Sequence, residues 1–178
     1  MTEKELIQAC IRGERKGQEE VFRRYAGKML VVCLRYARHR MEAEDILQDA
    51  FIKVFKNLGS FKQKGSFEGW IRRIVVNTAL KNIDRKSFTN EQIGGELEYE
   101  RGSDPVIYSE LGEEELLKMI ASLPDGYRIV FNLYAIEGLS HKEIAELLDI
   151  GESTSRSQLV KARKVLQDMI LKTQKIAV

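Results

Sequence analysis

Apolar residues recur at three- and four-residue spacings along both ends of the chain, which is the pattern of amphipathic helices. In the first half this spacing predicts helices over residues 3–12, 18–39, 42–58 and 67–85. After a polar stretch it predicts helices over residues 113–122, 125–137, 142–148 and 154–172. No alternation of apolar and polar residues is long enough to predict a strand. The chain is therefore expected to be all-α.

Local sequence marks where several helices begin. Thr2 with Glu5, and Ser140 with Glu143, have the spacing of a capping box, in which side chain and backbone bond reciprocally. Residues 13–17, bracketed by glycines, are the expected break between the first two helices. The second helix is expected to turn one face to the core, made of Val21, Phe22, Tyr25, Met29, Val32, Cys33 and Tyr36.

Residues 140–154 have the composition of a helix-turn-helix. Ala145 is small where two helices must approach closely, and Gly151 suits a tight turn. Ile150 is expected to fill the core from the turn, and Ser153 is a good N-cap for the next helix. Two short helices joined in this way are typical of DNA-binding proteins.

The last predicted helix has a buried face and a basic exposed face. The buried face contains Ser155, Leu159, Ala162, Leu166 and Met169, and an aliphatic residue is expected where Ser155 stands. The opposite face presents Arg156 at its edge, with Ser157, Val160, Lys161 and Lys164. Basic and hydroxyl groups beside an apolar contact are what a major-groove reader needs. The alternative is a solvated helix of an ordinary bundle; the cap, turn glycine and basic face together favour DNA binding.

The helix predicted over residues 42–58 carries a polar stripe. Asp45, Gln48, Asp49 and Ile52 follow the three- and four-residue spacing of one helix face. Taken alone, such a stripe is usually a solvated surface. A metal pair at the two aspartates has no third ligand within reach, so the sequence predicts no metal site.

A second polar stripe lies on the helix predicted over residues 67–85. Its core candidates are Phe67, Trp70, Ile71, Ile74 and Val75. Arg73, Asn77 and Lys81 share another side, with Arg72 adjacent, and the preceding loop over residues 60–66 adds Phe61, Lys62 and Lys64. Basic side chains follow phosphates, and an aromatic with polar neighbours can hold an unstacked base of single-stranded DNA. The alternative is again a basic, solvated helix.

Charge divides the chain into three parts. Residues 1–86 carry 19 Lys/Arg and 11 Asp/Glu, residues 87–116 carry one Arg and nine Asp/Glu, and residues 117–178 carry nine basic and seven acidic residues. The middle stretch also contains Gly94-Gly95 and Pro105, with few apolar residues. These shifts predict two small helical domains, residues 1–86 and 113–178, joined by a flexible acidic linker over residues 87–112.

Several classes of protein are excluded. No apolar run approaches the roughly 20 residues of a membrane span, and the N-terminus lacks the pattern of a secretory signal, so a cytoplasmic location is expected. Cys10 and Cys33 lie far apart in apolar contexts and are expected to be buried thiols, and His39 and His141 have no partner at ligand spacing. Without a nucleophile–base pair, metal cluster or phosphate loop, we expect no enzyme, cofactor or small-molecule substrate.

Both halves together resemble the extracytoplasmic-function group of bacterial sigma factors. The matching pieces are residues 43–51, 67–79, 123–124, 136–140 and the helix-turn-helix through Arg163. They occur in the right order and at the right separation, and the resemblance covers residues 3–86 and 113–170. Two departures are Ser155 in place of an aliphatic residue and Gln158 in place of Arg, which bear on the promoter sequence.

The resemblance implies roles for both stripes and for the last helix. Asp45, Gln48, Asp49 and Ile52 would dock on core RNA polymerase, while the loop 60–66 and the helix after it would read the minus-ten promoter element. The exposed residues of the last helix would read the minus-thirty-five element. Residues 129–136 would offer an apolar groove to the polymerase flap. The implied partners are core polymerase, promoter DNA and an anti-sigma factor that can hold the protein at the membrane, and the free chain is expected to be a monomer.

Two other classes compete with this interpretation. One is a helix-turn-helix regulator whose N-terminal bundle senses a ligand or forms a dimer; the outward basic stripe with Arg73 and Asn77 argues against it, because a sensor needs a pocket. The other is a recombinase or nuclease, for which the chain shows no catalytic constellation.

Overall fold

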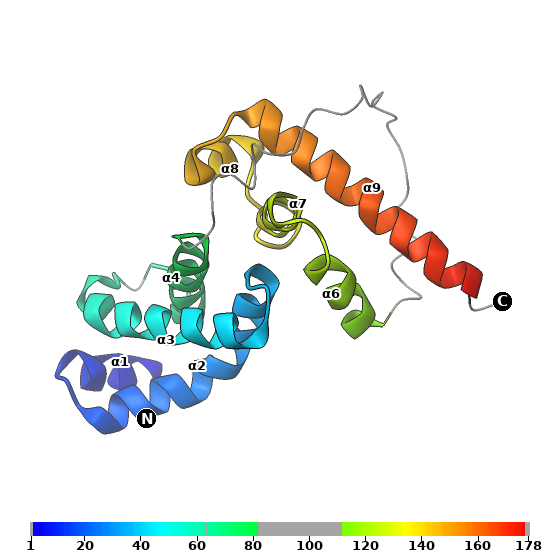
Figure 1. The fold of residues 1–178 in the computed structure, drawn as a ribbon. Coiled ribbons are helices and arrows are strands. Elements are labelled where there is room, and N and C mark those ends of the chain that lie inside the picture. The colour runs from blue at the N-terminus through cyan, green and yellow to red at the C-terminus, as the bar shows by residue number, and fades with distance from the viewer. Residues whose placement is uncertain (1, 63, 82–111, 177–178) are drawn as a thin grey trace. The chain divides into compact units, whose positions relative to one another are not determined.

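The computed structural model describes residues 2–62, 64–81 and 112–176 of the chain. Within these ranges every regular element is a helix, as the all-α prediction required (Figure 1). Contacts divide the chain into two compact units, residues 1–83 and 84–178, called here the N-terminal and the C-terminal unit. The predicted acidic linker, apart from Gly112, lies outside the described residues.

The N-terminal unit is a bundle of three helices with a fourth packed against one of them. Its elements are α1 (Glu3–Ile11), α2 (Arg15–Tyr36), α3 (Arg40–Asn57), the 3-10 turn η1 (Leu58–Ser60) and α4 (Phe67–Lys81). Helices α2, α3 and α4 pack on one another, and α1 packs on α2. The predicted helix to residue 85 is described only to Lys81, and Arg85 lies outside the described residues.

The first capping box forms as predicted, but the break after it is shorter. The backbone N–H of Glu5 donates to Thr2 Oγ1 at 3.3 Å, and the Thr2 N–H donates to Glu5 Oε2 at 2.8 Å. Gly13 has a φ of 77°, which makes it the turn residue. Gly17, in contrast, lies inside α2, where an added Cβ would come within 2.9 Å of the Ala9 Cβ. Gly17 is therefore a point of close helix contact and not an edge of the break.

The predicted core faces are largely but not fully correct. In α2, six of the seven predicted residues are buried, but Phe22 is 41% exposed. Helix α3 begins at Arg40, earlier than predicted, because the Glu42 N–H donates to His39 Nδ1 at 3.2 Å and so caps the helix. In α4, Trp70 and Ile74 are only half-buried, while Val76 takes a buried position.

The C-terminal unit contains the predicted helix-turn-helix. Its elements are α6 (Glu113–Ala121), α7 (Asp125–Phe131), the π-helical turn η3 (Asn132–Ile136), α8 (His141–Leu148) and α9 (Glu152–Ile176). Helix α9 packs against α6, α7 and α8. The single helix predicted over residues 125–137 changes to π-helix at Asn132, whose carbonyl accepts the N–H of Glu137 at 3.0 Å.

The predicted flap groove over residues 129–136 is wrong for most of its length. Ile129, Val130, Phe131 and Leu133 are buried in the core of the C-terminal unit. Because α7 packs against α9, the side chains of Ile129, Val130 and Phe131 are covered by the unit itself and are not offered to a partner.

The turn of the helix-turn-helix differs in detail from the prediction. Ser140 and Glu143 form the predicted capping box, and the Ser140 hydrogen bonds lower the pKa of the Glu143 carboxyl. The left-handed residue is Asp149, with φ 56°, and the Ile150 N–H donates to the carbonyl of Ala145. Helix α9 begins at Glu152, so Ser153 lies inside the helix and the prediction that it caps α9 is wrong.

Candidate nucleic-acid and protein interfaces

The residues predicted to read duplex DNA lie together on the outer side of α9. Arg156, Ser157 and Lys164 are exposed, and Val160 and Lys161 are half-buried. Arg156 Nη2 forms an ion pair with Glu152 Oε2 at 2.7 Å, with the Arg156 side chain 55% exposed. Such an exposed pair is worth little and can be exchanged for a phosphate or base contact.

The inner side of α9 contains two polar residues that the structure buries. Ser155 is 0% exposed and Gln158 is 3% exposed, beside the predicted core residues Leu159, Ala162 and Leu166. The hydroxyl of Ser155 lies 2.9 Å from His141 Nδ1 on α8, so the serine is hydrogen-bonded rather than loosely packed. At the far end of this face Ile170 is buried and the predicted Met169 only half-buried. Sequence reasoning missed the bond because its partners lie 14 residues apart on different helices.

The predicted stripe on α4 is exposed as expected from its spacing. Arg73, Asn77 and Lys81 are exposed, and Arg72 beside them is half-buried. Thr78 lies on the inner side of the helix, where its hydroxyl accepts a hydrogen bond from Lys53 Nζ at 3.1 Å. The stripe therefore presents two cations and an amide to solvent.

An aromatic cluster holds the loop that precedes α4. The Phe61 ring centroid lies 5.2 Å from Phe67 and 5.4 Å from Trp70, and Tyr25 meets Phe67 edge to face at 5.5 Å. Contacts of this kind favour a fixed arrangement of the rings. Phe61 and Trp70 remain half-buried, and the loop residues Lys62 and Lys64 are exposed. Gln63 lies outside the described residues.

The predicted stripe on α3 is also exposed. Asp45, Gln48 and Asp49 are exposed, and Ile52 is 51% exposed. Neither aspartate forms an ion pair with another residue of the described parts of the chain. Two carboxylates, an amide and an aliphatic side chain are thus open to a partner.

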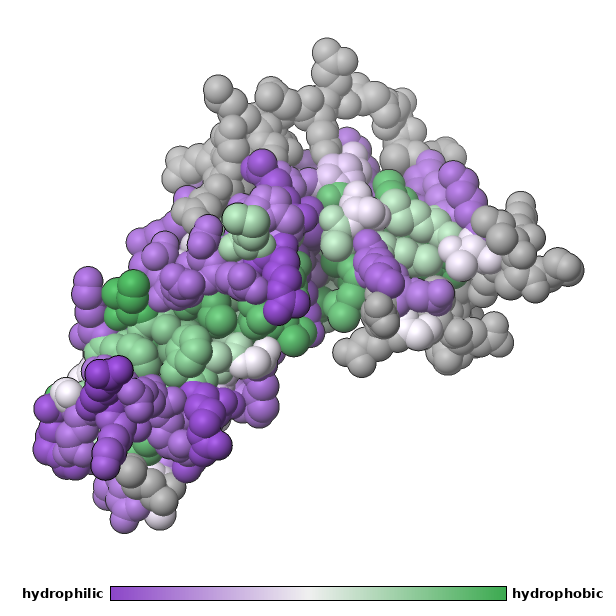
Figure 2. Space-filling model, turned by 60° about the horizontal axis from the view of Figure 1, so that its bottom comes forward, coloured by the Kyte–Doolittle hydropathy of each residue, from purple (hydrophilic) through white to green (hydrophobic). Residues whose placement is uncertain are grey.

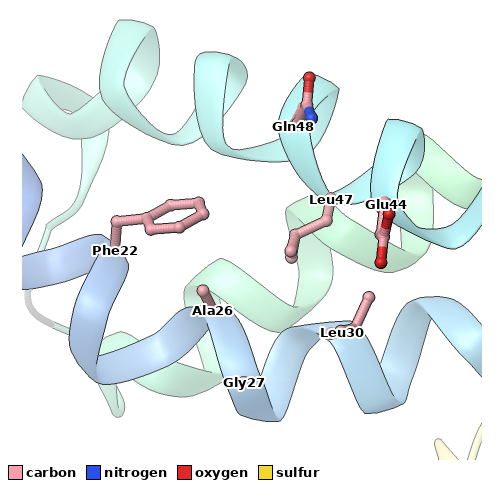
Figure 3. Close-up of a pocket in the computed structure, with 7 residues that line it drawn as sticks. All are labelled: Phe22, Ala26, Gly27, Leu30, Glu44, Leu47 and Gln48. Atoms are coloured by element: carbon pink, nitrogen blue, oxygen red, sulfur yellow. The ribbon is translucent and has the colours of Figure 1, made fainter. Parts of the chain in front are cut away.

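A groove that the sequence did not predict runs beside this stripe. It has a volume of about 310 Å³, opens to solvent between α2 and α3, and shares Gln48 with the stripe. Its lining residues are Phe22, Ala26, Gly27, Leu30, Glu44, Leu47 and Gln48. Phe22, Leu30 and Leu47 point into the space between the two helices (Figure 3). In the space-filling view, a hydrophobic band crosses the N-terminal unit between hydrophilic surfaces (Figure 2).

The two cysteines are buried, as predicted. Burial raises the pKa of the Cys33 thiol to about 12, and burial and the nearby Glu14 carboxylate raise the pKa of Cys10. Both side chains are therefore thiols and not thiolates near neutral pH. Over the described ranges, no three His, Cys, Asp or Glu side chains gather as a possible metal site, and no helix there is long and apolar enough to cross a membrane.

Comparison with known proteins places both units in one family. The family described as Sigma-70 region 2 matches residues 21–89, and the family described as Sigma-70, region 4 matches residues 113–166. The ECF RNA polymerase sigma-E factor of Escherichia coli K12 is 28% identical over 182 residues, covering 96% of this chain and 95% of the relative. The namesake from Haemophilus influenzae is 28% identical over 183 residues, covering 96% of both chains.

A solved structure shares the fold. The sigma factor RpoE of Bartonella quintana, in complex with the anti-sigma factor NepR, is 19% identical with a TM-score of 0.51 and covers 86% of this chain and 96% of that one. The chain matches both sigma regions, and its sigma-E relatives match it nearly end to end. These matches identify this chain as an RNA polymerase sigma factor of the extracytoplasmic-function group.

Proposed function

We propose that the two units divide the work of promoter recognition. Residues 1–86 dock on core RNA polymerase and read the minus-ten element, residues 113–178 read the minus-thirty-five element, and residues 87–112 join them. The observation that carries the proposal is that each matched region exposes its own polar stripe, on α4 and on α9. Each DNA-binding surface alone binds weakly. Holding both surfaces on one polymerase raises the effective concentration of the second surface once the first has bound.

The docking surface is the α3 stripe together with the adjoining groove. Asp45 and Asp49 supply negative charge, Gln48 a hydrogen-bonding amide and Ile52 an exposed aliphatic side chain. An apolar centre beside charged groups is the usual anatomy of a protein interface, in which the charges set orientation and the apolar surface supplies affinity. This surface supports a partner that offers basic side chains beside an apolar ridge, and we assign it to core polymerase.

The minus-ten surface is formed by α4 and its preceding loop. In this proposal the cations Lys62, Lys64, Arg72, Arg73 and Lys81 follow the phosphates of the nontemplate strand, and Phe61 and Asn77 contact the captured base. The Phe61–Phe67–Trp70 cluster supports this role because it holds the loop against α4 before DNA arrives. Capturing an unstacked base offsets the few kcal/mol that flipping costs.

Replacing Asn77 by Ala is expected to reduce open-complex formation about tenfold, because one polar contact to a flipped base is worth about 1–3 kcal/mol. The folded chain should be unaffected, since Asn77 is exposed. Permanganate footprinting of the melted region measures the effect, with Lys16→Ala on the exposed start of α2 as control. If the variant loses as much on a template lacking the captured base as on the intact one, Asn77 does not read that base.

The minus-thirty-five surface is the outer face of α9. Arg156, Ser157, Val160, Lys161 and Lys164 offer two kinds of contact, cationic or hydroxyl groups for base edges and phosphates, and one aliphatic group for a thymine methyl. Helix α8, capped by Ser140 and Glu143, supports α9 from behind.

We further infer that the chain carries no catalytic activity, binds no small-molecule substrate and is a monomer when free. The chemistry of initiation belongs to the polymerase. An anti-sigma factor is a proposed regulator, supported by the Bartonella quintana relative that was solved with one. In this proposal the chain acts in the cytoplasm at the nucleoid and is held inactive by that regulator, which can sit at the membrane.

Run-off transcription with purified core polymerase and a randomised promoter library tests the proposed function. The chain is expected to select a set of templates with two separated conserved elements and to start transcription on them. A helix-turn-helix regulator, the second candidate, would bind DNA without conferring initiation on the core enzyme. Absence of selected initiation, with the chain folded and the core active on a control factor, would refute the proposal.

A further inference from the structure

Three elements of the C-terminal unit meet at one imidazole. His141 is the first residue of α8, and its Nδ1 lies 2.9 Å from the Ser155 hydroxyl in the first turn of α9. Its ring stacks on Tyr134 of η3, with centroids 4.7 Å apart and planes 22° apart. The Arg163 guanidinium, two turns further along α9, lies 5.7 Å from the centre of the Tyr134 ring. Helix α9 therefore meets the His141–Tyr134 pair at two points.

We propose that His141 is a positioning residue for DNA recognition, which through Ser155 and Tyr134 fixes the first turn of α9 against α8. This inference rests on the proposed contact between the outer face of α9 and the minus-thirty-five element. Ser155 directly precedes Arg156 and lies two residues before Ser157, and both of these are proposed readers. Rotation of this turn would move both readers relative to the major groove, whereas phosphate contacts further along the helix tolerate such movement.

The burial of Ser155 is the reason that the bond matters. A hydroxyl that is 0% exposed is costly unless it is hydrogen-bonded, and His141 is its partner on the neighbouring helix. In this chain a directional bond between His141 and Ser155 joins the two helices α8 and α9. A directional bond specifies one relative orientation more narrowly than apolar contact does.

The same geometry makes the contact titratable. Burial and the cations Arg156 and Arg163 of α9 lower the pKa of His141, Glu152 of the same helix raises it, and Tyr134 faces it as a neutral ring. Near neutral pH in the free chain the imidazole is therefore neutral, and Nδ1 can accept the Ser155 proton. After protonation Nδ1–H can donate to the Ser155 oxygen, so the contact persists in both states.

DNA binding should raise the proton affinity of His141. Phosphates near Arg156 offset the positive potential that disfavours the imidazolium in the free chain. Because the complex then holds the proton more tightly than the free chain, affinity for the minus-thirty-five duplex rises as pH falls from about 7 to about 6.

The test uses the full chain and a duplex that the wild-type holoenzyme selects from a randomised library. All proteins in the test, the reference included, carry His39→Asn, which retains a hydrogen-bond acceptor near the α3 cap. The sequence has two histidines, so His141 is then the one that remains. Fluorescence anisotropy measures dissociation constants for the selected duplex and for a scrambled one of equal length. Measurements at about pH 6 and about pH 8 give the proton linkage.

Removing either partner should weaken specific binding and spare non-specific binding. His141→Leu and Ser155→Ala are each expected to lose about fivefold to tenfold on the selected duplex, with little change on the scrambled one. The double variant should lose no more affinity than the single variant with the larger loss, since His141 and Ser155 act as one unit. His141→Asn, whose amide occupies the place of Nδ1, should stay within about twofold of wild type and lose the pH dependence.

Each outcome decides the inference. An unchanged ratio of specific to scrambled affinity in Ser155→Ala overturns it, whether neither duplex loses affinity or both lose it equally. Loss of pH dependence in His141→Asn supports it, and persistence of that dependence overturns the linkage. If Arg156→Ala and Lys161→Ala also leave specific binding intact, the proposed function itself fails; if these two lose binding and His141→Leu does not, only the positioning role fails.

Discussion

Replacing Asp49 by Lys is expected to lower the affinity of the chain for core RNA polymerase at least about 100-fold and to abolish run-off transcription. Asp49 is exposed on α3 beside Gln48 and the apolar groove, so a partner that fits this surface offers it positive charge. Placing like charges opposite each other at an interface costs several kcal/mol, and each 1.4 kcal/mol or so is about tenfold in affinity. Fluorescence titration of labelled chain with core enzyme measures the loss.

The control for this prediction is Glu19→Lys in the same unit. Glu19 is exposed on α2 and pairs only with Arg15 among the described residues, so the variant makes the same charge change away from α3. It is expected to bind core polymerase within about twofold of wild type. Equal losses in the two variants would mean that net charge, and not the α3 stripe, sets the affinity. An unaffected Asp49→Lys variant would remove the stripe from the docking surface.

The double replacement Arg156→Ala and Lys161→Ala is expected to lower transcription from the selected promoters about 100-fold. Each side chain contributes about 1–3 kcal/mol if it contacts a base and less if it contacts only a phosphate. Loss of a phosphate contact also lowers the salt dependence of promoter binding, by about one unit of slope for each contact removed. Promoter binding by the holoenzyme at several salt concentrations therefore separates base contacts from phosphate contacts.

Lys172→Ala serves as the matched control on the same helix. Lys172 is exposed on α9, about two turns beyond Lys164, and lies outside the proposed reading face. It should leave both the affinity and the salt slope unchanged. The proposed reading face is wrong if Lys172→Ala loses as much as the double variant, or if the double variant retains wild-type promoter selection.

The approximate positions of the helices and the two capping boxes followed from local sequence. The boxes of Thr2 with Glu5 and of Ser140 with Glu143 form as predicted, because each satisfies backbone groups within four residues. The exposed stripes of α3, α4 and α9 also follow from spacing alone, since side chains three and four residues apart share one face. Such features depend on neighbours along the chain, which a single sequence displays.

Contacts between helices were predicted less well. Periodicity predicted Phe22 in the core. The neighbouring helices cover the side of α2 that carries Val21 and Tyr25, whereas Phe22 lines a groove together with Leu47. The π-helical turn at Asn132 had no distinct pattern, although it presents Tyr134 to His141. The prediction placed the tight turn at Gly151 and the cap of α9 at Ser153. In the structure the left-handed residue of the turn is Asp149, and a positive φ is uncommon for a residue other than glycine.

The sequence by itself determined that this protein is helical, that an acidic stretch separates two helical modules, and which side chains face solvent on three helices. Only the tertiary structure decided what lies beneath and beside those faces: the groove between α2 and α3, and the hydrogen bond that turns Ser155 from an irregular core residue into the partner of His141. The physical reason is range. Caps and helix faces are set by interactions within about one turn, whereas grooves and buried polar pairs need two helices brought together by the packing of the whole unit.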